Sequence, residues 1–469
     1  MLKNTIILSI GTFFPKLAAF ILVPVLTGYL SKADYGTYEL VLTLVGLVLP
    51  AATLQIQSAA FRFLIDCKED EEEQSVIISN IYSFIFVTST AALIITFVVL
   101  HLIHHPLSIC VTICLYFFFD IIANANKQVI RGLGRNIDYA IGSFISAIGQ
   151  MILIFSLVVF VKIGLLGGLI GLAGAEFLSA TYLLFRGRIY KLIKFRNMNR
   201  KKLKELLAYS WPMVPNSLSQ WVMHVSDRLV ITGFMGPVAN GIYAAAYKVP
   251  SILNFAQSTF NMAWQENASI VSKDDDTPKY YSEMFAVLFD IVAGCMAVLI
   301  GITPFLFKVM IRGDYGSDSY YQIPILYMGT FFFCLSSFWG GIFVAFKKTV
   351  NVGVTTVAAA ALNLLIDLTT IHYIGLYAAS ISTLVSYIAL CAFRLISVRR
   401  FIKLKYNILH CALVLSFLTA QCVACYQQNR VLNIITFVAG MAAGMYLTRN
   451  LIKGIIKKLA KIIRKRKKA

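Results

Sequence analysis

Four basic side chains lie within otherwise apolar segments of membrane-spanning length: Lys16, Arg62, Arg228 and Lys248. A cation at the centre of a bilayer costs about 2.5–3.5 kcal/mol on insertion scales, so it is retained where it faces water or an anion. The four residues therefore predict a positively charged chamber within the membrane. Such a chamber points to the transport of a negatively charged substrate.

The composition excludes a soluble globular protein. Of the 469 residues, 58% are hydrophobic and 14% are charged, and the mean hydropathy is +0.75. Soluble domains are about 45–50% apolar and ~25% charged, and a single core cannot bury this much apolar surface. The predicted fold class is therefore an all-α polytopic membrane protein.

The net charge of +20 is concentrated in two basic segments, residues 186–204 and 449–468, which flank apolar spans. Basic residues in such places anchor the chain to anionic lipid on the cytoplasmic side, so no nucleic-acid partner is predicted.

Among the nine cysteines, Cys422 and Cys425 form a CxxC pair within an apolar helix, with no second pair or histidine nearby. We predict no metal site, and no cofactor other than Na⁺ or H⁺ as a coupling ion.

Fourteen apolar segments are long enough to span a membrane. They lie at about residues 5–30, 37–65, 75–101, 107–131, 137–161, 164–185, 205–234, 239–264, 281–310, 321–346, 350–374, 376–398, 406–426 and 431–448. The loops after even-numbered spans contain most of the basic residues, Lys127 among them, which predicts that both termini are cytoplasmic. No outer loop exceeds roughly ten residues, too few for the extracytoplasmic catalytic loop of a glycan polymerase or ligase.

The first half of the chain recurs in the second half. Four residues of 27–38 match four of 232–243 at one constant offset: Thr27, Gly28, Gly36 and Tyr38 with Thr232, Gly233, Gly241 and Tyr243. Spans 1–6 and 7–12 are therefore predicted to be two pseudo-symmetric six-helix bundles around a central cavity, related by a parallel repeat. The predicted parts are the bundles 1–185 and 205–398, a basic linker 186–204, two accessory helices in 399–448 and a basic tail 449–469.

Most prolines lie in the first two spans of each half, the same spans that contain the four cations. They are Pro15, Pro24, Pro50, Pro212, Pro215 and Pro250. Each removes a helix hydrogen bond and favours a kink, which beside a polar cavity predicts a gate. Kinks that serve packing alone are the alternative for any single proline.

Acidic residues within the spans are candidates for ion coupling. They are Glu39, Asp120, Glu176, Asp290 and Asp367. One or more could bind Na⁺ or H⁺, and the alternative is that each partners polar groups inside a bundle. A third possibility needs no ion, because two negative charges leaving a negative-inside cell gain roughly 4–5 kcal/mol at 100 mV.

Several segments resemble a known family. Residues 209–236 (YSWPMVPNSLSQWVMHVSDRLVITGFMG) and 240–253 (NGIYAAAYKVPSIL) resemble the seventh and eighth helices of bacterial polysaccharide flippases. Those proteins translocate O-antigen or capsule repeat units and belong to the multidrug/oligosaccharidyl-lipid/polysaccharide exporter superfamily. Residues 26–40, 129–143 and 361–387 resemble the family's first outer loop, its turn between helices 4 and 5, and its helices 11 and 12. The resemblance covers residues 1–400.

The resemblance implies alternating access by two bundles around a cavity lined by helices 1, 2, 7 and 8, which here contain the four cations. It implies a substrate oligosaccharide on undecaprenyl diphosphate, moved from the inner to the outer leaflet of the bacterial inner membrane for cell-surface polysaccharide such as lipopolysaccharide O-antigen. The implied partners are membrane lipids and, beyond the substrate, a glycan polymerase and a chain-length regulator, with the protein itself monomeric. The implied activity is transport and not enzymatic catalysis.

Two other functions share this fold. A drug/cation antiporter of the same superfamily should have carboxylates, not an excess of Lys and Arg, along its cavity. A lipid II flippase of peptidoglycan synthesis would have the same cationic chamber and is excluded less cleanly by the sequence.

Overall fold

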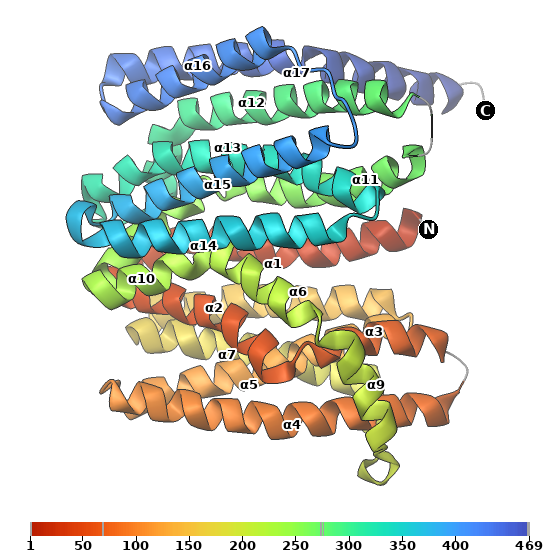
Figure 1. Ribbon diagram of the computed structural model, residues 1–469. Coiled ribbons are helices and arrows are strands. Elements are labelled where there is room, and N and C mark those ends of the chain that lie inside the picture. The colour runs from red at the N-terminus through yellow and green to blue at the C-terminus, as the bar shows by residue number, and fades with distance from the viewer. Residues whose placement is uncertain (1, 68–69, 273, 275, 467–469) are drawn as a thin grey trace. The chain divides into compact units, whose positions relative to one another are not determined.

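The structure is a computed structural model that describes residues 2–67, 70–272, 274 and 276–466. Throughout these residues the chain is helical, with turns and short connections and no strands (Figure 1). The all-α fold class expected from the composition is therefore confirmed. The end of the expected basic tail, residues 467–469, lies outside the described residues.

The chain divides into two compact units, residues 1–244 and 245–469. The first unit contains α1 (Leu2–Tyr29), α2 (Lys32–Thr53), α3 (Ile56–Asp66), α4 (Glu71–Leu102), α5 (Leu107–Gly132), α6 (Asn136–Phe155), the π-helix η1 (Ser156–Phe160), α7 (Gly164–Arg186), α8 (Ile189–Leu192), the 3₁₀ turn η2 (Phe195–Asn197), α9 (Arg200–Ser210) and most of α10 (Met213–Lys248). Within it, α7 packs against both α5 and α6, α1 packs against α6, and α3 packs against α5.

The second unit contains α11 (Ile252–Val271), α12 (Thr277–Met310), α13 (Gly316–Ala345), α14 (Thr349–Ile374), α15 (Tyr377–Arg399), α16 (Ile408–Tyr426) and α17 (Arg430–Arg466). Here α15 packs against α13 and α14, and α12 packs against both α16 and α17. The last two helices are thus attached to this unit through α12. The division into units follows contacts, so the bundle boundaries expected from the repeat stay predictions.

Side chains cap the N-terminal ends of several helices. Ser31 caps α2 by accepting a hydrogen bond from the backbone N–H of Asp34, at 3.0 Å. Asp70 does the same for the first turn of α4, and Asn199 for that of α9. These side chains satisfy N–H groups that have no partner within a helix. The two very short turns expected near residues 162–164 and 372–375 are present, with left-handed backbone at Lys162, Gly164 and Gly375.

Twelve helices of the described chain are long and apolar enough to cross a membrane, against the fourteen spans expected. In the first expected span, only Phe14–Tyr29 is counted, as a shorter apolar helix. The expected seventh and eighth spans, 205–234 and 239–264, are distributed over α9, α10 and α11, with one qualifying segment, Val225–Lys248.

The helices around Arg62, Arg228 and Lys248 are interrupted, whereas α1, which contains Lys16, is continuous. Left-handed residues at Leu54 and Gln55 separate α2 from α3, four residues after Pro50. Gly236 breaks α10 with φ 84° and ψ 175°, directly before Pro237. Pro15 and Pro24 lie within α1, Pro215 lies in the first turn of α10, and Pro212 and Pro250 lie in turns that flank α10. A gating role for these breaks stays a prediction.

Candidate functional site: charged residues within the helices

An ion pair joins α2 to α10 inside the first unit. The guanidinium of Arg228 donates to Glu39 Oε2 at 2.8 Å and to the hydroxyl of Thr43 at 3.3 Å. The side chains of Arg228 and Glu39 are only 9% and 2% exposed. Two turns before Arg228 on α10, the indole N–H of Trp221 donates to the carbonyl of Thr43 at 2.7 Å. Two buried opposite charges in contact neutralise each other, which lets both occupy apolar helices.

Arg228 therefore contacts a carboxylate on another helix, and the preceding residue, Asp227, faces a different group. The carboxylate of Asp227 accepts a hydrogen bond from the hydroxyl of Tyr243 at 2.9 Å. Consecutive residues of a helix point about 100° apart, so Asp227 and Arg228 meet different neighbours. Arg228 can contact a phosphate only if its contact with Glu39 is loosened.

The backbones of α2 and α10 touch at the glycines of the repeat. A Cβ on Gly36 would lie 1.9 Å from the carbonyl oxygen of Pro237, and one on Gly241 would lie 2.1 Å from that of Lys32. Asn240 donates from its side chain to the carbonyl of Gly36 at 2.7 Å. Gly36 and Gly241 are equivalent positions of the repeat, and so are Lys32 and Pro237. The contact is therefore reciprocal, and only glycine fits on either side of it.

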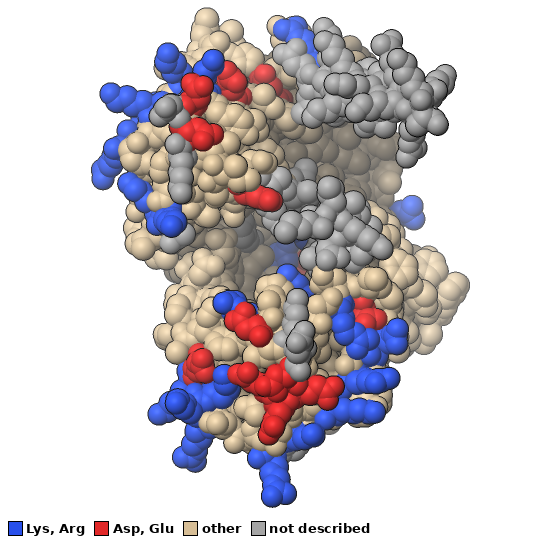
Figure 2. Space-filling model, turned by 90° about the vertical axis from the view of Figure 1, so that its right-hand side faces the viewer, with Lys and Arg blue, Asp and Glu red and all other residues tan. Residues whose placement is uncertain are grey.

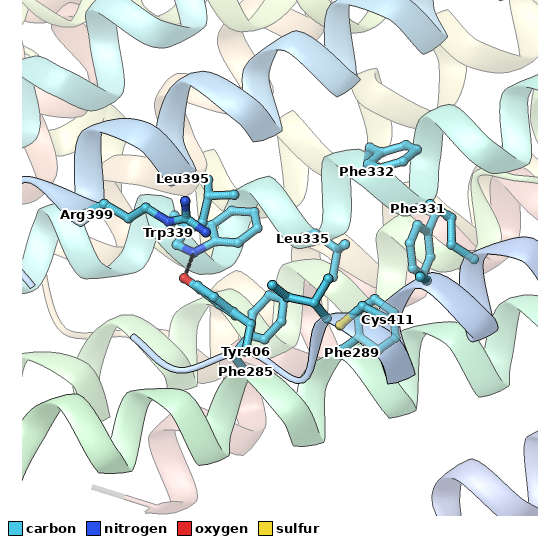
Figure 3. Close-up of a pocket in the computed structure, with 13 residues that line it drawn as sticks. Phe285, Phe289, Phe331, Phe332, Leu335, Trp339, Leu395, Arg399, Tyr406 and Cys411 are labelled. Atoms are coloured by element: carbon cyan, nitrogen blue, oxygen red, sulfur yellow. Dashed lines mark hydrogen bonds between the residues drawn. The ribbon is translucent and has the colours of Figure 1, made fainter. Parts of the chain in front are cut away.

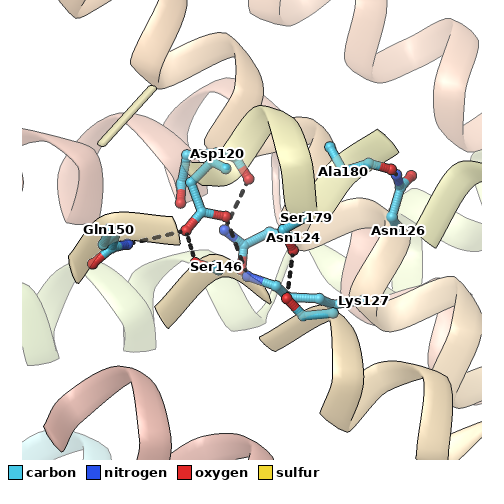
Figure 4. Close-up of polar contacts among 10 residues, drawn as sticks. Asp120, Asn124, Asn126, Lys127, Ser146, Gln150, Ser179 and Ala180 are labelled. Atoms are coloured by element: carbon cyan, nitrogen blue, oxygen red, sulfur yellow. Dashed lines mark hydrogen bonds and ion pairs between the residues drawn. The ribbon is translucent and has the colours of Figure 1, made fainter. Parts of the chain in front are cut away.

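A second polar cluster lies between α5, α6 and α7 (Figure 4). The buried carboxylate of Glu176 accepts hydrogen bonds from Ser146, from Gln150 at 3.4 Å and from the ammonium of Lys127 at 3.3 Å. Asp120 lies within electrostatic range of both Glu176 and Lys127. Two carboxylates and one ammonium leave a net charge of −1 when all are ionised, so the cluster could take up one cation or proton.

Sequence reasoning assigned Lys127 to a cytoplasmic loop, and this was wrong. It lies within α5 with 17% of its side chain exposed, paired with Glu176. The signal was present, because Asp120, Asn124 and Lys127 have the spacing of one helix face. Asn124 donates to the backbone carbonyl of Asp120 at 2.9 Å. The sequence suggested two roles for Glu176, ion coupling or partnering of polar groups inside a bundle. Its contacts with Ser146, Gln150 and Lys127 agree with the second role.

The other predicted cations lie in different settings. Lys16 is exposed on α1, and Lys248 is half-buried at the end of α10, in the second unit. Arg62 forms an ion pair with Asp66 one turn along α3, with side chains 52% and 60% exposed. An exposed pair of this kind contributes only about 0–1 kcal/mol, so Asp66 does not prevent Arg62 from binding another anion.

Further ion pairs lie close to Arg62, at the end of the first unit where α3, α4 and α9 meet. The ammonium of Lys202 lies 3.1 Å from Glu73 and 3.2 Å from Glu205. Burial acts to lower the pKa of Lys202, but the two carboxylates raise it above its usual value. Figure 2 shows the resulting mixture of acidic and basic side chains in the lower part of the view.

Two other predicted ion-coupling residues lie in the second unit. Asp290 on α12 contacts the imidazole of His410 on α16 at 2.7 Å, so it connects two helices. Asp367 is fully buried on α14. Sequence reasoning missed Arg394 on α15, which is buried and donates to Thr355, Thr356 and the carbonyl of Ser336. It lies close to the expected end of its span, where a basic residue is usually interfacial.

The fold and the buried charges define a multi-pass membrane protein. Residues 1–266, more than half of the sequence, match the polysaccharide biosynthesis protein family, and the chain belongs to that family. A search of curated proteins found no match.

Solved structures with the same fold are transporters of low sequence identity. The lipid II flippase MurJ, in an inward closed conformation, is 16% identical, with a TM-score of 0.72 over 96% of this chain and 100% of that chain. A multidrug resistance MATE family transporter of the MOP superfamily, in an inward-facing conformation, is 12% identical, with a TM-score of 0.68 over 88% of this chain and 99% of that chain. An outward-facing conformation of such a transporter is 13% identical, with a TM-score of 0.58 over 88% of this chain and 96% of that chain.

Proposed function

We propose that the protein moves an oligosaccharide linked to undecaprenyl diphosphate from the inner to the outer leaflet of the bacterial cytoplasmic membrane. The product would serve the assembly of a surface polysaccharide such as O-antigen or capsule. The observation that carries the proposal is the placement of Lys16, a cation in the apolar helix α1 whose side chain is exposed. Membership of the polysaccharide biosynthesis family supports a glycan as the cargo.

The substrate chemistry fits the cations. The diphosphate has about two negative charges, which cannot enter hydrocarbon without compensation. In the proposed path, Lys16 and Arg62 meet the diphosphate first, because the side chains of both are exposed. Arg228 contributes only after Glu39 releases it, so the arriving phosphate would compete with Glu39. Lys248 would act from the second unit.

Alternating access requires a contact that closes and opens. The reciprocal backbone contact of Gly36 and Gly241 is suited to this role, because it borders the break at Gly236. Under the predicted topology it lies on the outer side of the membrane. The kinks near Pro50 and Pro250 would let the ends of these helices move without unfolding them.

Coupling has two candidate sources. The membrane potential alone would favour export of the two charges of the diphosphate. The cluster of Glu176, Asp120 and Lys127 is the candidate for an ion-coupled step, and H⁺ fits it better than Na⁺. Lys127 already occupies one side of the Glu176 carboxylate, which leaves little of the oxygen cage that Na⁺ needs.

The experiment is lipid flipping by purified protein in vesicles with an undecaprenyl-diphosphate oligosaccharide. We expect Lys16→Gln and Arg62→Gln each to lower the rate at least tenfold while leaving thermal unfolding unchanged. Arg430→Gln, an exposed basic residue at the start of α17, is the matched control and should transport normally. Full activity of both Lys16→Gln and Arg62→Gln would exclude the proposed chamber. Imposing a potential or a pH gradient in the same vesicles separates the two sources of coupling.

A lipid II flippase is the second candidate, favoured by the extent of the shared fold with MurJ. Lipid II has the same polyprenyl diphosphate and differs in its sugar and peptide, so the charged residues do not discriminate between them. Flipping of lipid II at a rate equal to or above that of the oligosaccharide would support this alternative. A glycan polymerase and a chain-length regulator stay proposed partners, and the monomeric state stays a prediction.

A further inference from the structure

An apolar pocket of about 280 Å³ lies in the second unit, bordered by α12, α13, α15 and α16 (Figure 3). Phe285 and Phe289 of α12 and Leu335 and Trp339 of α13 form much of its wall. The connection between α15 and α16 passes over one end and contributes Tyr406. The wall is almost entirely apolar, so its natural occupant in a membrane is a hydrocarbon chain.

One end of the pocket contains polar groups. The indole N–H of Trp339 donates to the hydroxyl oxygen of Tyr406 at 3.1 Å, and the ring of Phe285 lies 4.9 Å from that of Tyr406. Since the Tyr406 oxygen accepts this bond, its own proton can be donated to another group. The guanidinium of Arg399 lies 5.8 Å from the Tyr406 ring, and Figure 3 shows it beside Trp339.

The charge around this end is strongly positive. Arg399 and the following Arg400, Lys403 and Lys405 are all exposed. Among the residues that the structure describes, none of these four forms an ion pair with a carboxylate. Basic groups at the mouth of an apolar pocket between membrane helices attract anionic lipid head groups.

We propose that this pocket is a binding site for a resident anionic phospholipid. One acyl chain fills the space between α12, α13 and α16, and the phosphate is bound by the guanidinium of Arg399 and the hydroxyl of Tyr406. The bound lipid would then fasten α16 to the rest of the unit, together with the contact of Asp290 and His410. The site does not depend on the transported substrate.

The test is native mass spectrometry of the full chain purified from membranes that contain phosphatidylglycerol. The wild type should retain one phosphatidylglycerol, and adding this lipid should raise its melting temperature more than adding phosphatidylcholine does. Removing one charge near a membrane surface weakens lipid binding about fivefold, so Arg399→Gln should raise the dissociation constant for phosphatidylglycerol about fivefold and lower the retained fraction. Ala412→Trp, which places a large ring in the pocket, should abolish retention.

Two control variants test whether the loss of a charge or the addition of a ring elsewhere in the protein has the same effect. Arg430→Gln removes an exposed basic residue from the start of α17, and Ala442→Trp adds the same ring to an exposed position of α17. Both should retain the lipid as the wild type does. The proposal would be overturned by any of three results. These are equal retention of phosphatidylcholine, equal stabilisation by inorganic phosphate, and a retained polyprenyl-diphosphate glycolipid in place of the phospholipid. Unchanged retention in both Arg399→Gln and Ala412→Trp would also overturn it.

Discussion

Adding one methyl group at Gly36 should open the contact between α2 and α10. In the structure, a Cβ at this position would lie 1.9 Å from the carbonyl oxygen of Pro237 and 2.7 Å from the nitrogen of Gly241. Real Cβ atoms essentially never come closer than 3.0 Å to such atoms. The two backbones must therefore separate by about 1 Å, since neither partner is a side chain that can rotate away.

Overlap of this kind costs about 1–3 kcal/mol. If the cost falls only on the closed arrangement, the ratio of open to closed forms should rise about 5- to 150-fold in Gly36→Ala. The same reasoning applies to Gly241→Ala, whose Cβ would lie 2.1 Å from the carbonyl of Lys32. The repeat relates the two positions, so both substitutions should act in the same direction.

Cysteine labelling measures this change. Asn240 is fully buried and donates to Gly36, so Asn240→Cys reports separation of the two helices through its rate of reaction with a hydrophilic maleimide. The reporter removes the Asn240 hydrogen bond from every variant, which leaves the Cβ overlap as the difference under test. Four native cysteines that are not buried must first be replaced by alanine: Cys67, Cys114, Cys295 and Cys411. The labelling rate then follows the open fraction, provided that opening and closing are faster than labelling.

Gly233→Ala is the matched control. Gly233 lies in the same helix α10, and a Cβ there meets nothing within 4 Å. This substitution should leave labelling unchanged, or lower it slightly through its higher helix propensity. Equal labelling rates in Gly36→Ala and Gly233→Ala would refute the reasoning, because the same group would then be tolerated in a filled and in an empty position.

Three further outcomes are expected. Glu39→Gln should destabilise the protein to thermal unfolding by about 3–5 kcal/mol, because it removes the carboxylate that contacts the buried guanidinium of Arg228. The double variant Glu39→Arg with Arg228→Glu exchanges the two charges and should recover more than half of the stability that its two single substitutions lose. If the losses of the two single variants simply add in the double variant, the two residues do not form a direct pair. Glu176→Gln keeps an acceptor for Ser146 but removes the charge, so flipping in vesicles should lose its response to a pH gradient and keep its response to a potential. A wild-type response to pH in that variant would place proton coupling elsewhere.

Much of the fold could be predicted from single segments. Most apolar runs became helices close to the expected bounds, as for residues 75–101 and α4 or 350–374 and α14. The very short turns near Lys162 and Gly375 were also located correctly. These features depend on hydropathy and on local backbone preference, which neighbouring residues determine.

Partners of charged residues could not be predicted in the same way. Arg228 was predicted to bind a phosphate, and nothing in the sequence indicated its contact with Glu39, which lies on α2, far away in the sequence. Lys127 was read as a loop residue because basic residues cluster at helix ends, although its partner Glu176 holds it within the unit. A buried charge contacts whatever the packed helices bring to it, and no local rule specifies that residue.

The sequence by itself determined that this is a polytopic helical membrane protein with an internal repeat, because apolar length and recurring residues need no partner to be recognised. It also determined that cations lie within apolar segments. Placing a cation within a bilayer costs free energy, so these residues call for a functional explanation. Only the tertiary structure decided which charges are neutralised inside the protein and where two backbones meet at Gly36 and Gly241. Both depend on the packing of helices distant in sequence, where separations of a few ångströms decide whether charges pair and whether a side chain fits.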